Sequence, residues 1–170
     1  AEAWRYVRKR PLFWVSSVMI VLALLMAALP GLFTSVDPRL CELSNSLADP
    51  TSGHPFGFDR QGCDIYSRTI YGARASVSVG VLTTLLVVLI GGTIGALAGY
   101  FGGFIDAILS RLTDVFFAVP LVLAAIVVMQ MFKDSRTIVT VVVVLAAFGW
   151  TNIARITRGA VMSVKNEEFV

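Results

Sequence analysis

Four apolar stretches, separated by polar segments, make up most of this 170-residue chain. They cover residues 12–33, 74–101, 106–132 and 137–153. Each stretch is near or above the length of about 20 residues that an α-helix needs to cross roughly 30 Å of hydrocarbon. Residues 34–73 form a long polar segment, whereas 102–105 and 133–136 are short turns. The pattern predicts an all-α, polytopic transmembrane helical bundle with four spans and one long loop.

The first apolar stretch has a second interpretation. Arg5, Arg8, Lys9 and Arg10 precede it, as basic residues precede the apolar region of a secretory signal peptide. However, the stretch is too long for a signal peptide, and no small-residue cleavage site follows it. We therefore expect residues 12–33 to be a retained first span.

The distribution of Lys and Arg predicts the orientation of the chain. With residues 1–11 in the cytoplasm, eight of the 14 basic residues lie on the inner side and six on the outer side. This margin is small, so the prediction rests mainly on the four basic residues near the N-terminus. It places 34–73 and 133–136 outside the cell, and 102–105 and 154–170 inside.

The composition fits a membrane protein and not an ordinary soluble domain, because 56% of the residues are apolar and only 15% are charged. The net charge of +3 comes from basic residues at the ends of apolar runs, which indicates topology and a lipid partner but no nucleic acid. The chain lacks a glycine-rich phosphate loop, and His54 is its single histidine. We therefore expect no cofactor, metal or catalytic centre in this chain.

Glycines recur every four residues in the second stretch, at Gly91, Gly95, Gly99 and Gly103. This spacing places them on one face of a helix, where small residues let another helix approach closely. Packing against a helix of the same chain is the favoured interpretation. A subunit interface or a sliding contact is the alternative.

The third stretch opens with charged residues, Asp106, Arg111 and Asp114. Charges in this position are costly unless they are paired or hydrated. One interpretation is a structural ion pair, in which Arg111 reaches Asp114 at i,i+3 and Asp106 lies at the helix start. The other is a proton or ion relay, and it is less favoured because residues 115–128 contain no ionisable group.

Pro120 lies inside the same stretch, where it removes a backbone hydrogen bond and should kink the helix. The kink is a candidate hinge or a fixed bend. At the end of the fourth stretch, Arg155 and Arg158 are candidates to bind lipid headgroups or to fix the cytoplasmic end.

Both cysteines of the chain, Cys41 and Cys63, fall in the loop predicted to lie outside. A disulfide closing a loop of about 20 residues contributes roughly 3 kcal/mol to stability. We favour the bond over two free thiols, because the expected location is oxidising.

Three segments resemble the C-type permease subunit of dipeptide and oligopeptide ABC importers. The first contains His54, Pro55, Phe56, Gly57, Asp59, Gly62, Asp64, Ser67, Arg68, Tyr71, Gly72, Arg74 and Ser76. The second contains Gly99, Tyr100, Phe101, Gly102 and Gly103, followed by Asp106, Arg111, Asp114 and Pro120. The third contains Trp150, Arg155, Arg158 and the tail to Val170. Two positions depart from the family pattern, since Phe58 stands where Thr is usual and Cys63 where Arg is usual.

The resemblance implies a permease of six spans, of which this chain would hold the first four, in a bacterial inner membrane. Its expected partners are a homologous permease, two cytoplasmic ATPase subunits, which hold ATP and Mg²⁺, and an extracytoplasmic peptide-binding protein. Asp59, Asp64, Arg68 and Arg74 are then candidates for an extracytoplasmic gate or docking surface. Glu167, Glu168, Phe169 and Val170 would lead into the loop that couples the permease to the ATPases.

The favoured function is therefore that of a membrane subunit that helps to import di- or oligopeptides, driven by ATP hydrolysis in partner subunits. An ion-coupled secondary transporter that uses Asp106 and Asp114 is the alternative. A membrane scaffold without transport activity is a third possibility. No inverted repeat or broken helix pair in the sequence favours the secondary transporter.

Overall fold

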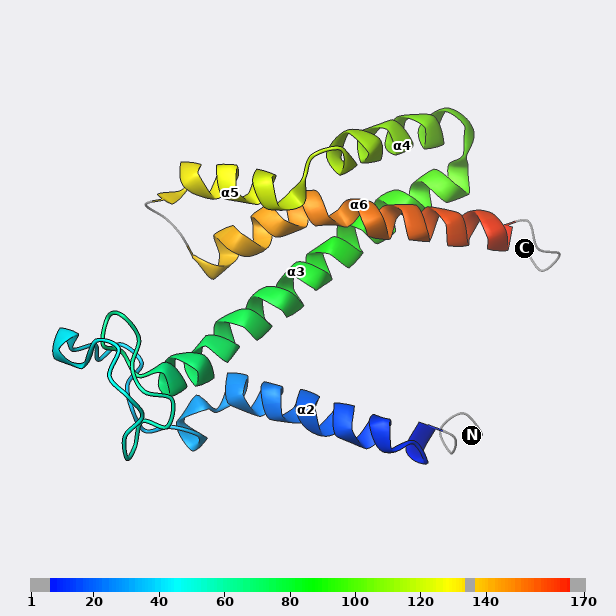
Figure 1. The fold of residues 1–170 in the computed structure, drawn as a ribbon. Coiled ribbons are helices and arrows are strands. Elements are labelled where there is room, and N and C mark those ends of the chain that lie inside the picture. The colour runs from blue at the N-terminus through cyan, green and yellow to red at the C-terminus, as the bar shows by residue number, and fades with distance from the viewer. Residues whose placement is uncertain (1–6, 134–136, 166–170) are drawn as a thin grey trace. The chain divides into compact units, whose positions relative to one another are not determined.

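The computed structural model describes residues 7–133 and 137–165 of the chain. Its elements, in chain order, are α2 (Pro11–Ala28), η1 (Pro30–Leu32), η2 (Leu43–Asn45), α3 (Ile65–Phe101), α4 (Gly103–Phe117), α5 (Leu121–Met131) and α6 (Ile138–Lys165) (Figure 1). In the described part of the chain the only β-structure consists of isolated bridges within the segment between α2 and α3. The prediction of an all-α fold is confirmed.

Three helices, α2, α3 and α6, are each long and apolar enough to cross a membrane. The helices α4 and α5 reach this length only as a pair, which is bent by 77°. The described residues therefore provide three spans, or up to four if the bent pair counts as one. This range includes the four spans that the sequence predicts, while the division of the chain between the membrane and its two sides stays a prediction.

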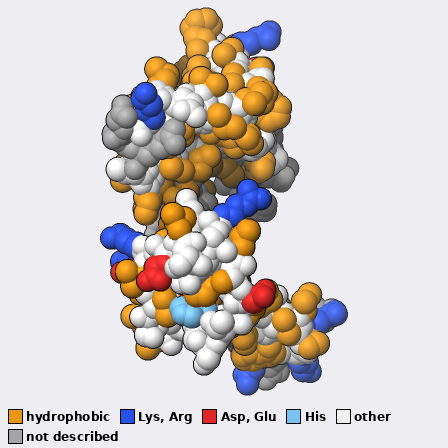
Figure 2. All heavy atoms as spheres, turned by 60° about the vertical axis from the view of Figure 1, so that its left-hand side comes forward, with side chains coloured by type: hydrophobic (Ala, Val, Ile, Leu, Met, Phe, Trp, Pro, Cys, Tyr) orange, Lys and Arg blue, Asp and Glu red, His pale blue; other side chains and the backbone are white. Residues whose placement is uncertain are grey.

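Large apolar side chains are exposed over most of these helices (Figure 2). In α2, for example, Leu12 is 73% exposed and Met19 is 67% exposed, and Ala27 is the only residue of this helix that is buried. A helix that is apolar on all sides and unburied in its own chain matches a lipid or protein environment, not water.

The helix α3 begins earlier than the span expected over 74–101. It starts at Ile65 and has 37 residues, so it is about 55 Å long at 1.5 Å per residue. This length exceeds the roughly 30 Å of the hydrocarbon core. The first turns of α3 are therefore a helical extension of the polar segment, a feature that hydropathy alone does not reveal.

The kink expected at Pro120 is present as a break in the helix at residues 118–120, which separates α4 from α5. The break coincides with Pro120, which stands at the N-cap of α5 with φ −60° and ψ 115°. Proline cannot donate the hydrogen bond of a helix interior, and it disfavours the helical conformation of the residue before it. The predicted kink is thus a full interruption, and its role as a hinge stays a prediction.

The chain divides into two compact units, residues 1–77 and 78–170, and each is described by itself. In the second unit, α6 packs against both α4 and α5 (Figure 1). Its buried residues include Val142, Ala146 and Trp150. The ring of Phe116 in α4 lies 5.6 Å from that of Trp150 and 6.0 Å from that of Phe148, measured between centroids. The helix α6 is therefore the centre of packing in this unit.

Candidate functional site

Three glycines of α3 allow the backbone of α6 to approach closely. A Cβ atom added at Gly91 would lie 2.5 Å from the carbonyl oxygen of Trp150, and one added at Gly95 would lie 2.3 Å from that of Ala154. At Gly99 the distance to a carbonyl oxygen of α6 is 2.9 Å. Such distances leave no room for a side chain, so glycine is required for this contact. The structure thus places three of the four predicted glycines in packing within the chain.

The fourth glycine, Gly103, does not take part in this contact, which corrects the prediction. Nothing lies within 4 Å of a Cβ atom added at Gly103. The chain turns at Gly102, with φ +65°, and Gly103 then begins α4 with φ +50°. Because the two helices are separate, the spacing of four residues no longer places Gly103 on the face of α3.

Two arginines of α6 pair with the two aspartates of α4. The guanidinium of Arg158 donates two hydrogen bonds to Asp106, of 2.5 Å and 2.6 Å, and the hydroxyl of Ser110 donates a third, of 3.0 Å. Arg155 donates a hydrogen bond of 2.8 Å to Asp114. The bidentate contact of Arg158 with Asp106 fixes both the distance and the orientation of α6 relative to α4.

The prediction of an ion pair between Arg111 and Asp114 is therefore wrong. Within the described residues Arg111 has no ion pair, and Asp114 is paired with Arg155. An ion pair at i,i+3 on the exposed face of one helix contributes little to stability. The pair between Arg155 and Asp114 instead connects two packed helices that are distant in the sequence. Arg155 gains a further contact, since its guanidinium carbon lies 4.0 Å from the ring centroid of Phe117.

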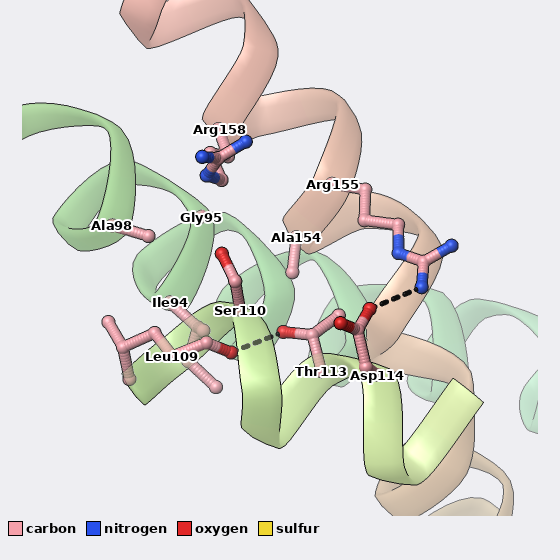
Figure 3. A pocket seen from close by; sticks show the side chains of 10 residues that line it. All are labelled: Ile94, Gly95, Ala98, Leu109, Ser110, Thr113, Asp114, Ala154, Arg155 and Arg158. Carbon is pink, nitrogen blue, oxygen red and sulfur yellow. Dashed lines mark hydrogen bonds and ion pairs between the residues drawn. The ribbon is translucent and has the colours of Figure 1, made fainter. Parts of the chain in front are cut away.

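A pocket of about 270 Å³ lies beside these ion pairs, between α3, α4 and α6. Figure 3 shows Ser110 and Asp114 of α4 on one side of it and Arg155 and Arg158 of α6 on the other. The hydroxyl of Thr113, also in the lining, donates to the carbonyl of Leu109 at 2.8 Å and is thus satisfied within α4. The pocket has a polar lining and room for several water molecules.

A contact near the end of α6 joins it to the end of α3. The ammonium group of Lys165 donates a hydrogen bond of 2.6 Å to the carbonyl oxygen of Tyr100 and lies 5.8 Å from the centroid of its ring. Carbonyl groups in the last turn of a helix lack partners within the helix, so a lysine there acts as a cap. The described part of α6 is therefore attached to α3 at its last residue.

In the first unit, Asp64 caps the start of α3. Its carboxylate accepts the backbone N–H of Ser67 at 2.8 Å and contacts the Nδ1 atom of His54 at 3.1 Å. The Ser67 hydroxyl in turn shares a buried hydrogen bond of 2.8 Å with the hydroxyl of Thr34. Burial by itself raises the pKa of Asp64, but the hydrogen bonds from Ser67 and His54 outweigh burial and hold the pKa below its usual value.

Asp59 organises the turn that precedes Asp64. One carboxylate oxygen accepts the backbone N–H groups of Gln61 and Cys63, at 2.8 Å and 3.1 Å, and the other pairs with Arg68. The hydrogen bond from Cys63 contributes most to lowering the pKa of Asp59, with further contributions from Gln61 and Arg68. Asp59 and Arg68 therefore connect the turn to the first turn of α3.

Two glycines of this segment are required by its geometry. Gly57 has φ +68° and Gly62 has φ +74°, in the left-handed region that other residues rarely adopt. A Cβ atom at Gly62 would lie 1.7 Å from the carbonyl oxygen of Glu42, and one at Gly57 would lie 2.6 Å from that of Ala48. The disulfide bond between Cys41 and Cys63, which the sequence predicts, closes the same fold.

The predicted gate or docking residues do not form one surface. Asp64 is 1% exposed and serves as a helix cap, while Asp59 and Arg68 pair with each other. Arg74 is exposed and lines a separate pocket. A role of these residues in docking stays a prediction. The predicted coupling residues, Glu167 to Val170, lie outside the described residues.

The sequence interpretation missed the roles of Arg155 and Arg158 as partners of Asp114 and Asp106. A signal was present, since charged residues within or directly beside apolar stretches are rare and tend to pair there. It also missed Ser67 and Thr34, because a hydrogen bond between residues 33 positions apart leaves no local pattern.

Comparison with known proteins assigns both parts of the chain to the same kind of transporter. Residues 91–170 match the model of the binding-protein-dependent transport system inner membrane component. Residues 1–50 match the model of the N-terminal transmembrane domain of oligopeptide transport permease C.

Several curated proteins are similar over nearly the whole chain. The oligopeptide transport system permease protein OppC of Bacillus subtilis is 37% identical over 163 residues, which are 96% of this chain and 53% of the relative. The dipeptide transport system permease protein DppC of the same organism is 38% identical over 170 residues, or 99% of this chain and 52% of the relative. The glutathione transport system permease protein GsiD of Pectobacterium atrosepticum is 38% identical over 121 residues, or 71% and 40%.

The chain thus spans about half the length of these two Bacillus relatives. The two family models cover separate parts of the sequence, and the relatives connect these parts in one alignment. The chain therefore belongs to the family of binding-protein-dependent transport system inner membrane components, with the C permeases of oligopeptide and dipeptide transport systems among its relatives.

Proposed function

We propose that this chain is part of the permease subunit of an ABC importer that carries di- or oligopeptides into the cytoplasm. The observation that carries the proposal is the similarity to peptide permeases over nearly the whole chain. The glutathione permease among the relatives also fits a peptide cargo, since glutathione is a tripeptide.

In this proposal the protein lies in the inner membrane of a bacterium with residues 1–11 in the cytoplasm. It pairs with a homologous permease, receives cargo from an extracytoplasmic peptide-binding protein, and is driven by two ATPase subunits that hold ATP and Mg²⁺. The chain itself contributes no catalytic group. Glu167 to Val170 lead toward the coupling contact with the ATPases.

The contacts of α6 support a role in transmitting motion. Its backbone is packed against the glycines of α3, its arginines are paired with α4, and Lys165 attaches its end to Tyr100. A displacement applied to the end of α6 is therefore transmitted to α3 and α4, since packed helices move as units. The three helices form a block that responds together to the ATPases.

The ion-coupled secondary transporter is a weaker candidate, even though the break between α4 and α5 supplies one interrupted helix that the sequence did not reveal. A proton relay needs a carboxylate that releases and accepts protons during transport. Both Asp106 and Asp114 are instead engaged by arginines, and Asp106 also accepts a hydrogen bond from Ser110. Both carboxylates therefore join α4 to α6, and this geometry favours a structural role over a relay.

The test is to tag the gene product that contains this chain, purify it gently from its native membrane, and identify the co-purifying proteins. We expect a second permease and two ATPase subunits in stoichiometric amounts. Uptake of a labelled dipeptide or tripeptide into proteoliposomes should then require ATP and the peptide-binding protein. Purification of the chain alone, with peptide uptake abolished by an ionophore and indifferent to ATP, would refute the proposal.

A further inference from the structure

A second pocket lies in the unit of residues 1–77, between the segment that follows η1 and the first turns of α3. Its volume is about 580 Å³, and it is lined by Ser35, Asp37, Pro38, Arg39, Tyr71 and Arg74. None of the interactions described for the α4–α6 ion pairs involves this pocket.

The charges of this pocket favour an anion. Among residues 7–133 and 137–165, neither Arg39 nor Arg74 has an ion pair with a carboxylate. The one acidic residue of the lining, Asp37, uses its Oδ1 atom to accept the backbone N–H of Arg39 at 2.9 Å. Two guanidinium groups and one carboxylate leave a net positive charge, and guanidinium groups match the geometry of a phosphate.

The pocket is held in place by hydrogen bonds that do not use its charged groups. The hydroxyl of Tyr66 in α3 donates to the carbonyl oxygen of Phe33 at 3.2 Å. The buried hydrogen bond between Thr34 and Ser67 joins the next residue of the segment to α3. Because both sides of the pocket are fixed, a ligand would meet preformed walls and a small cost of ordering.

The position of Arg74 and Tyr71 in the sequence indicates what supplies the anion. Arg74 opens the apolar stretch 74–101 and comes three residues before Val77, its first large apolar residue. Tyr71 precedes Arg74 by less than one helical turn. When the apolar run occupies the hydrocarbon, these two side chains lie at the level of the lipid headgroups. Tyrosine and arginine are both typical of this interface.

We propose that this pocket binds the phosphate group of an anionic phospholipid, such as phosphatidylglycerol, at the membrane surface. Arg39 and Arg74 contact the phosphate, and the hydroxyls of Tyr71 and Ser35 are available to the glycerol headgroup. The volume of about 580 Å³ exceeds what a bare phosphate requires, so part of the headgroup enters as well. The bound lipid anchors the start of α3 to the leaflet on that side.

The test uses the purified transporter in nanodiscs of phosphatidylcholine that contain increasing amounts of a photoactivatable phosphatidylglycerol. Cross-links to the peptides that carry Arg39 and Tyr71 are quantified by mass spectrometry. We expect the double variant Arg39→Gln, Arg74→Gln to weaken this labelling by about 30-fold in apparent affinity, since each arginine near an anionic surface contributes roughly fivefold.

The matched control is Arg60→Gln, which removes an exposed arginine of the same loop that does not line the pocket. It should leave the labelling unchanged. The double variant Arg39→Lys, Arg74→Lys keeps both charges and should retain labelling within about threefold of the original protein. An intact bond between Cys41 and Cys63 in each variant shows that the loop is folded.

Three results would overturn the proposal. The first is equal labelling of the original protein and the glutamine variant. The second is competition by soluble glycerol phosphate at the concentration of the lipid, which would identify a site for a free anion. The third is a glutamine variant that keeps its lipid labelling but binds the extracytoplasmic peptide-binding protein more weakly, which would identify a protein contact.

Discussion

The segment between α2 and α3 and the contact between α4 and α6 are both built around aspartates, but they are stabilised in different ways. In the segment, Asp59 and Asp64 accept hydrogen bonds from residues within ten positions in the sequence. The disulfide between Cys41 and Cys63 closes a loop that contains Asp59 and ends one residue before Asp64. In the helices, Asp106 and Asp114 meet arginines that follow 52 and 41 positions later.

This difference shows how a polar loop and a lipid-facing helix bundle hold charged groups. In the loop, the carboxylates accept hydrogen bonds from backbone N–H groups that have no partner in a helix or sheet. The disulfide adds stability by restricting the unfolded chain. In the helices the backbone is already satisfied, so the carboxylates need cations from other helices. The aspartates of the loop are held by neighbours in the sequence, whereas the helix contact exists only in the tertiary structure.

Removal of the disulfide should have the largest effect and should be confined to the loop. We expect the double variant Cys41→Ser, Cys63→Ser to lose about 3 kcal/mol of loop stability. Hydrogen exchange should become faster in peptides from residues 40–64 and stay unchanged in peptides from α6. Reducing agent should reproduce the effect in the original protein and have none in the variant, and equal protection of the loop without the bond would contradict the expectation.

Loss of one partner of the α4–α6 ion pairs should have the next largest effect. Asp106→Asn leaves Arg158 without its carboxylate, and we expect the second unit to lose about 2 kcal/mol, because an unpaired charge among apolar helices is costly. The measurement is the midpoint of thermal unfolding in detergent. The double variant Asp106→Leu, Arg158→Leu should recover most of this loss, and a double variant as unstable as the single one would argue against the pair.

The glycine contact offers a matched pair of substitutions within one helix. Gly95→Ala places a Cβ atom 2.3 Å from the carbonyl oxygen of Ala154, so we expect a loss of about 1.5 kcal/mol as α3 and α6 separate. Gly92→Ala meets nothing within 4 Å and should be neutral or slightly stabilising. The yield of intact complex on size-exclusion chromatography distinguishes them, and equal yields would show that α6 is not held by this contact.

Acid should weaken the loop through Asp64, and this should be the smallest effect of the four. The pKa of Asp64 is lower in the folded protein than in the unfolded chain, where the pKa of an aspartate is about 3.9. Folding therefore favours the ionised form, and its contribution is complete above about pH 4 and is lost as the pH falls through the lower folded value. Asp64→Asn should flatten the fall in loop protection below pH 4, measured by hydrogen exchange at several pH values, and an unchanged profile would exclude Asp64 as its source.

The sequence determined the class of fold and the composition of its parts. Apolar stretches long enough to cross a membrane predicted helices, because a backbone in lipid must satisfy its own hydrogen bonds. The spacing of Gly91, Gly95 and Gly99 predicted a flat helix face, and the two cysteines in one polar segment predicted their bond. Each of these predictions rests on a periodicity or a composition that is visible along one segment.

Only the tertiary structure decided which segments meet. It assigned Arg158 to Asp106 and Arg155 to Asp114, removed Gly103 from the glycine face, and divided the third apolar stretch at Pro120. The physical reason is that hydropathy and helical periodicity describe each helix about its own axis. The partner of a charge depends on the turns that set one helix against another, and here these turns lie at Gly102 and residues 118–120.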